Sequence, residues 1–65
     1  MLVVYGKYKS DRFKALNLET GETVNKLKQA TSFDNAQLEE LEEAVKELRE
    51  KNKDWKFEIR KKEIL

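Results

Sequence analysis

Residues 33–52, FDNAQLEELEEAVKELREKN, decide the fold because they have the pattern of an amphipathic helix. Asp34 is a good N-cap residue, and Gln37 follows it at the spacing of a capping box. Phe33 and Leu38 flank the cap as a hydrophobic staple would. Apolar residues then recur every three or four positions and form one stripe: Leu38, Leu41, Ala44, Val45 and Leu48. With Asn52 suited to the C-terminal end, we predict a helix over about residues 35–52.

The segments on both sides of this helix have the patterns of β-strands. From Trp55 to Arg60 apolar and charged residues alternate, which indicates a strand with one buried face. Residues 2–8 are apolar on both faces near their start, which favours a central strand, and Gly6 is expected to mark a bulge. Residues 12–18 form a second predicted strand. Residues 23–31 form a weaker third one, in which the alternation is irregular.

The predicted order β-β-β-α-β defines an α+β fold, with residues 1–65 as a single small domain. Short turns make the first three strands an antiparallel meander. The helix is then expected to return the fourth strand parallel to the first, giving a four-stranded mixed sheet in the order 4-1-2-3. One face of this sheet is expected to contact the helix stripe through Val3, Tyr5, Phe13, Ala15, Phe57 and Ile59. The tail at residues 61–65 is expected to fray.

The composition excludes several classes of site. The chain has no cysteine, histidine or proline, so zinc-finger, iron–sulfur, disulfide and thiol or imidazole chemistry are ruled out. Its two glycines stand alone, and no carboxylate pair is marked out from the surrounding acids. We therefore predict a non-enzymatic protein with no cofactor and no metal. The sequence has no apolar run of membrane-spanning length and no signal pattern, which predicts a cytoplasmic protein that does not contact membranes.

The charge is balanced overall but unevenly distributed. The net charge is +1, with 14 basic and 13 acidic residues. Residues 34–52 contain seven acidic and three basic residues, whereas residues 1–33 contain six basic and three acidic ones, and residues 53–65 five and three. The sequence therefore predicts an acidic helix between two basic flanks.

Three surfaces are candidates for binding. The first is an acidic docking surface on the helix: Glu39, Glu40, Glu43, Glu47 and Glu50. Such residues can dock on a basic partner, although glutamate is also common on ordinary helix surfaces. The second is a basic-aromatic hairpin surface, which could bind nucleic acid by stacking and phosphate contacts: Tyr5, Lys7, Tyr8, Lys9, Arg12 and Lys14, with Phe13 in the same hairpin. The same residues also fit a solvated hairpin, and a net charge of +1 is far from that of a typical nucleic-acid binder.

The third candidate surface is apolar. One helix covers one face of a sheet, so some apolar strand residues are expected on the other face, where they would support self-association: Leu2, Val4, Leu16 and Leu18. Alternatively, local bulges could rotate these side chains inward.

Several segments resemble short uncharacterised proteins of phages and mobile elements in Gram-positive bacteria. They are Arg12-Phe13-Lys14-Ala15, Thr20-Gly21, the helix entry Ala30-Thr31-Ser32-Phe33-Asp34-Asn35, and Phe57-Glu58-Ile59-Arg60. The resemblance implies a β-meander, a helix and a final strand, and no site residue. Such proteins, where their role is known, are often binders that modulate or inhibit host machinery, including defence systems. We therefore expect a protein-interaction module that binds a host protein, as a homodimer. The alternative is a small nucleic-acid-binding module.

Overall fold

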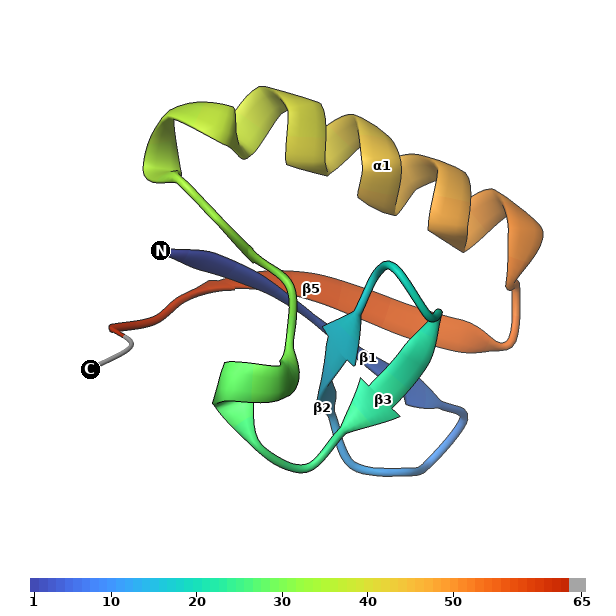
Figure 1. Ribbon diagram of the computed structural model, residues 1–65. Coiled ribbons are helices and arrows are strands. Elements are labelled where there is room, and N and C mark those ends of the chain that lie inside the picture. The colour runs from blue at the N-terminus through green and yellow to red at the C-terminus, as the bar shows by residue number, and fades with distance from the viewer. Residues whose placement is uncertain (64–65) are drawn as a thin grey trace.

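The computed structural model describes residues 1–63, in which a β-sheet lies against one α-helix (Figure 1). The elements are β1 (Leu2–Tyr8), β2 (Lys14–Asn17), β3 (Glu22–Val24), β4 (Ser32–Phe33), α1 (Leu38–Lys51) and β5 (Trp55–Lys61). Short 3₁₀ turns occupy Leu27–Gln29 and Asn35–Gln37. The predicted α+β class, with the helix on one face of the sheet, is confirmed.

Strand β1 lies at the centre of the sheet, as its two-sided apolar pattern predicts. β5 pairs with the whole length of β1 on one side. β2 and β4 share the other side, and β3 pairs with the outer edge of β2. The predicted order, in which the final strand lies beside the first, the first beside the second and the second beside the third, is therefore confirmed.

The direction of the final strand differs from the prediction. Every strand pair is antiparallel, so β5 runs antiparallel to β1 and the sheet is not mixed. The cause lies in the expected third strand at residues 23–31, which ends at Val24 and is followed by a 3₁₀ turn and β4. The backbone amide of Leu18 donates to the hydroxyl of Thr31 (2.9 Å) and anchors this reversal to β2. The chain therefore enters α1 from the end of the sheet where β1 begins, and not from the end where β1 finishes, as predicted. As a result, β5 runs antiparallel to β1 instead of parallel to it.

The core lies between α1 and one face of the sheet. Leu41 and Val45 of α1 are only 2% and 1% exposed. They form one cluster with four buried sheet residues: Leu2, Val4, Leu16 and Phe57. Burying such a side chain stabilises the fold by about 1.5–3 kcal/mol relative to exposure. In a chain of 65 residues this cluster is therefore the main source of stability.

The prediction of which β1 residues face the helix is wrong. Leu2 and Val4, and not Val3 and Tyr5, point toward α1. Side chains alternate along a strand, so a shift of one residue moves the whole set to the other face. Because β1 is apolar on both faces, its sequence does not say which face is covered. Ala15 is directly opposite Tyr5 and shares its face.

The helix predicted over residues 35–52 is present, but its first three residues form the 3₁₀ turn Asn35–Gln37, and α1 itself spans Leu38–Lys51. The backbone amide of Asp34 donates to Oε1 of Gln37 (3.0 Å), and the Asp34 carboxylate accepts from the amide of Ala36, which confirms the capping box. Asn52 ends α1 by donating from its side-chain amide to the carbonyl of Leu48 (3.1 Å), without a left-handed backbone. Leu38 is 41% exposed, because it lies one turn before Leu41, the first helix residue in the core.

Gly6 does not mark a bulge, since the register between β1 and β5 continues through it. A Cβ atom at Gly6 would lie 3.0 Å from a methyl carbon of Leu16 and 3.0 Å from a ring carbon of Phe57. Glycine therefore lets these two core side chains pack directly over the backbone of β1.

The C-terminal segment predicted to fray is partly paired. Lys61 is the last residue of β5. The amide of Lys62 donates to the carbonyl of Met1 (2.8 Å), and the N-terminal ammonium group donates to the carbonyl of Lys62 (3.0 Å). Ile64 and Leu65 lie outside the described residues.

Candidate functional site

The sheet face opposite α1 is formed by alternate residues of β1 and β5, and we call it the open face. Its residues are Val3, Tyr5 and Lys7 of β1, and Lys56, Glu58 and Arg60 of β5. Strand alternation places them there because the intervening residues face the core under α1. Within residues 1–63, α1 lies on the other face (Figure 1), while Leu27 of the short 3₁₀ turn borders Tyr5 and Phe13, and Val3 is fully buried.

Two aromatic rings on the open face are covered by three cations. The guanidinium carbon of Arg60 lies 4.4 Å from the centre of the Tyr5 ring and 5.3 Å from that of Phe13. Nζ of Lys62 lies 5.5 Å from the Tyr5 ring, and Nζ of Lys7 lies 5.1 Å from the Phe13 ring. A cation over a ring face gains about 0.5–1 kcal/mol at an exposed site. We call these five residues the cation–aromatic cluster.

An ion pair orients the central cation of this cluster. The carboxylate of Glu58 pairs with Nε of Arg60, two residues along the same face of β5. Both side chains are partly exposed, at 41% and 38%, so the pair adds little stability. It holds the guanidinium in one orientation over the Tyr5 ring. With three cations against one carboxylate, the surface is basic.

The predicted basic-aromatic surface is divided between two places. Tyr5, Lys7 and Phe13 belong to the cation–aromatic cluster. Tyr8 is on the opposite face of β1, where its ring centre lies 5.9 Å from that of Trp55. Strand alternation separates Tyr8 from Tyr5 and Lys7, since they differ in parity along β1. The remaining predicted residues are exposed in or beside the connection from β1 to β2: Lys9, Arg12 and Lys14.

Two members of the cation–aromatic cluster were not predicted: Arg60 and Lys62. The alternation after Trp55 indicates that Arg60 lies on the polar face of its strand, and the predicted order places that strand beside β1. Only the antiparallel register, which sets Arg60 opposite Val3, brings the guanidinium over Tyr5. The predicted parallel pairing has a different register, so it did not indicate the contact between Arg60 and Tyr5.

The predicted acidic docking surface is on α1, which lies on the opposite face of the sheet from the open face, and two of its residues, Glu39 and Glu43, also border the space between α1 and β5. All five of its residues are exposed: Glu39, Glu40, Glu43, Glu47 and Glu50. The structure therefore has a basic-aromatic face on the sheet and an acidic face on the helix.

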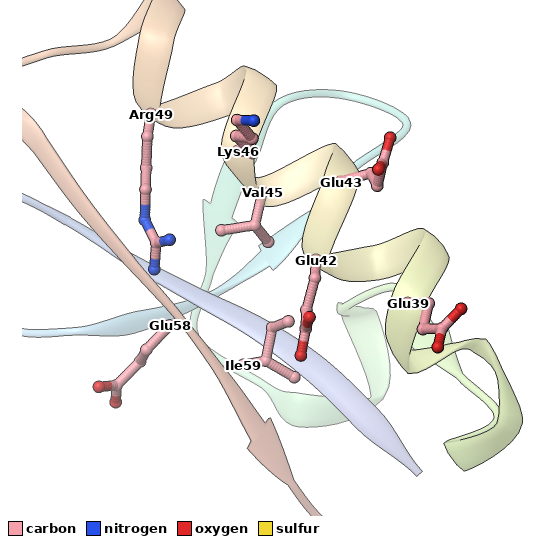
Figure 2. Close-up of a pocket in the computed structure, with 8 residues that line it drawn as sticks. All are labelled: Glu39, Glu42, Glu43, Val45, Lys46, Arg49, Glu58 and Ile59. Atoms are coloured by element: carbon pink, nitrogen blue, oxygen red, sulfur yellow. The ribbon is translucent and has the colours of Figure 1, made fainter.

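A groove of about 750 Å³ runs between α1 and β5 (Figure 2). Val45 and Ile59 lie at its centre. The α1–β5 groove is lined along the helix by charged residues: Glu39, Glu42, Glu43, Lys46 and Arg49. Arg49 crosses the groove, because its guanidinium donates to the backbone carbonyl of Phe57 (2.9 Å).

The predicted self-association surface is wrong. Leu2, Val4 and Leu16 are buried in the core under α1, and Leu18 is half-buried against the same cluster. These side chains point inward because β1 and β2 present them to the helix, and no bulge is needed to do so. They are not available to a partner on the surface.

Residues 1–63 contain no helix that is both long and apolar enough to cross a lipid bilayer, and no acidic cluster placed to hold a metal ion. Comparisons of the chain with protein-family models, with curated proteins and with solved structures found no match.

Proposed function

We propose that the chain is a non-enzymatic protein-interaction module that docks an acidic surface of a partner protein on its cation–aromatic cluster. One observation supports this proposal above the others: the open face presents Tyr5, Phe13 and Arg60 together, on the opposite side of the sheet from α1. Tyrosine and arginine are enriched among the residues that dominate binding energy at protein interfaces.

The charge of the cluster indicates the chemistry of the partner. Lys7, Arg60 and Lys62 surround the two rings, and Glu58 is already paired with Arg60. Complementary potentials favour an acidic surface and accelerate its association. The resemblance to proteins of phages and mobile elements favours a host protein, in the cytoplasm of the host cell, whose activity the module would modulate or inhibit.

Affinity purification from a Gram-positive lysate, followed by mass spectrometry, tests this proposal with the wild type and three variants. Arg60→Gln and Lys7→Glu alter the cation–aromatic cluster, and Glu50→Gln, at an exposed position of α1, is the matched control. We expect the cluster variants to recover at least about tenfold less partner than the wild type. The control should recover the same amount. If Glu50→Gln loses the partner while the cluster variants retain it, the acidic helix is the docking surface.

A second candidate function is binding of single-stranded nucleic acid on the same cluster. The stacked arrangement of Arg60 on Tyr5, beside Phe13, favours this candidate. Aromatic rings and guanidinium planes stack on bases while lysines contact phosphates.

Fluorescence polarisation with labelled single-stranded and duplex oligonucleotides distinguishes the two functions. Nucleic-acid binding predicts an affinity for the single strand that falls with salt, with a log–log slope of about −0.7 per contacted phosphate. Arg60→Gln should weaken that affinity and reduce the slope. No binding at low salt would exclude this candidate and leave the protein partner.

A further inference from the structure

The outer edge of β5 has no strand partner within residues 1–63. β5 has 7 residues, and its register against β1 continues without interruption from Trp55 to Lys61. A strand edge without a bulge presents backbone N–H and C=O groups that can pair with a strand of another chain.

The hydrogen bonds at the ends of β5 show which backbone groups face outward. The amide and carbonyl of Lys62 both bond to the first residue of the chain, so they face β1. Bonded pairs alternate along an antiparallel ladder, so the backbone groups of Phe57, Ile59 and Lys61 face away from β1. The bond from Arg49 to the carbonyl of Phe57 agrees with this assignment.

We propose that β5 pairs with β5 of a second copy of the chain, antiparallel and across a two-fold axis at Ile59. In this register Glu58 of each copy lies opposite Arg60 of the other. Moving the axis by one residue sets Glu58 opposite Glu58, or Arg60 opposite Arg60, which places like charges together. An axis at Phe57 would need the amide of Trp55, which already donates to the carbonyl of Asn52 (3.0 Å). In the Ile59 register the amide of Lys61 shares the Phe57 carbonyl with Arg49, which a carbonyl oxygen with two lone pairs allows, and Lys56 lies opposite Lys62 toward the ends of the strand. The two Glu58–Arg60 pairs beside the axis therefore decide in favour of this register.

The charges that line the α1–β5 groove are divided along the helix beside this edge (Figure 2). Val45 and Ile59 lie together at the centre of the α1–β5 groove, and α1 runs antiparallel to β5. On the N-terminal side of Val45 the groove is lined by Glu39, Glu42 and Glu43, and on the C-terminal side by Lys46 and Arg49. A two-fold axis normal to the sheet keeps both helices on one face of the joined sheet. It sets the acidic half of one helix beside the basic half of the other.

The competing outcome is an edge that stays unpaired. Lys56 and Lys61 are exposed on β5, and natural proteins often place lysine on edge strands to prevent pairing. Sedimentation velocity over a series of protein concentrations distinguishes the two outcomes. A dimer predicts a mass that rises with concentration toward twice the 7.7 kDa of the chain, and no further. A strictly monomeric wild type, or growth beyond two copies, would overturn the proposal.

Charge exchange tests the register itself. Glu58→Arg alone, and Arg60→Glu alone, each set like charges opposite one another in a homodimer. We expect each to weaken dimerisation at least about tenfold. Mixing the two variants restores opposite charges across β5, so native mass spectrometry should show the mixed dimer. Circular dichroism checks that both variants are folded.

A second pair of variants tests the helices and leaves the cation–aromatic cluster unchanged. Glu42→Lys and Lys46→Glu are substitutions at exposed positions of α1. Each should weaken the homodimer, and mixing them should restore a dimer. Dimerisation that is insensitive to both pairs of variants would place the interface elsewhere and overturn the assignment to β5. Because these variants do not alter the open face, their result is independent of the proposed partner binding.

Discussion

The guanidinium of Arg49, near the end of α1, donates to the backbone carbonyl of Phe57 (2.9 Å) on the outer edge of β5. This bond joins the helix to the strand that follows it, across the α1–β5 groove. The core beneath is small, so a bond outside the core that fixes the helix against the sheet has a measurable effect on stability.

Arg49→Ala should lower the free energy of unfolding by about 1 kcal/mol, the net value of a hydrogen bond of this kind. Lys46→Ala, on the same side of α1, is the control and should change it by less than about 0.5 kcal/mol. Urea unfolding followed by circular dichroism measures both. Equal effects of the two substitutions would show that the bond to Phe57 does not stabilise the fold.

Gly6→Ala should destabilise the fold by about 1–3 kcal/mol through overpacking. The added methyl group would lie 3.0 Å from side-chain carbons of Leu16 and Phe57. Leu16→Val shortens one of these neighbours, so the double variant should lose less stability than the two single losses added together. Thermal unfolding of the three variants gives this coupling. If the two losses of stability simply add, the loss caused by Gly6→Ala does not come from its contact with Leu16.

The sequence predicted the positions of the helix and strands more accurately than it predicted which face of each strand is buried. The caps of α1 and the alternation of β5 are local signals, and both are found where they were predicted. The face of β1 is not a local property, because Leu2-Val3-Val4 can bury either set of side chains. The direction of β5 depends on β4, which has only two residues and no pattern of its own. The cation–aromatic cluster depends on both, so the sequence predicted Tyr5, Lys7 and Phe13 but not Arg60 and Lys62.

Leu38→Ala should cost less than about 1 kcal/mol, whereas Leu41→Ala should cost about 2–5 kcal/mol. Both leucines belong to the apolar stripe in the sequence, but Leu38 is 41% exposed and Leu41 only 2%. Chemical denaturation of the two variants measures the difference. A large loss for Leu38→Ala would show that the staple with Phe33 forms and stabilises the start of the helix.

A double-mutant cycle on Tyr5 and Arg60 should give a coupling of about 0.5–1 kcal/mol in the free energy of unfolding. The cycle combines Tyr5→Leu with Arg60→Gln, because the guanidinium lies 4.4 Å from the ring centre. The same cycle with Tyr8→Leu should give no coupling, since Tyr8 is on the opposite face of β1 and contacts Trp55. This measurement also bears on function, because energy already gained between Arg60 and Tyr5 is not available to a partner. A coupling near zero would mean that the cation and the ring are held together only weakly. Both groups could then turn toward a partner at little energetic cost.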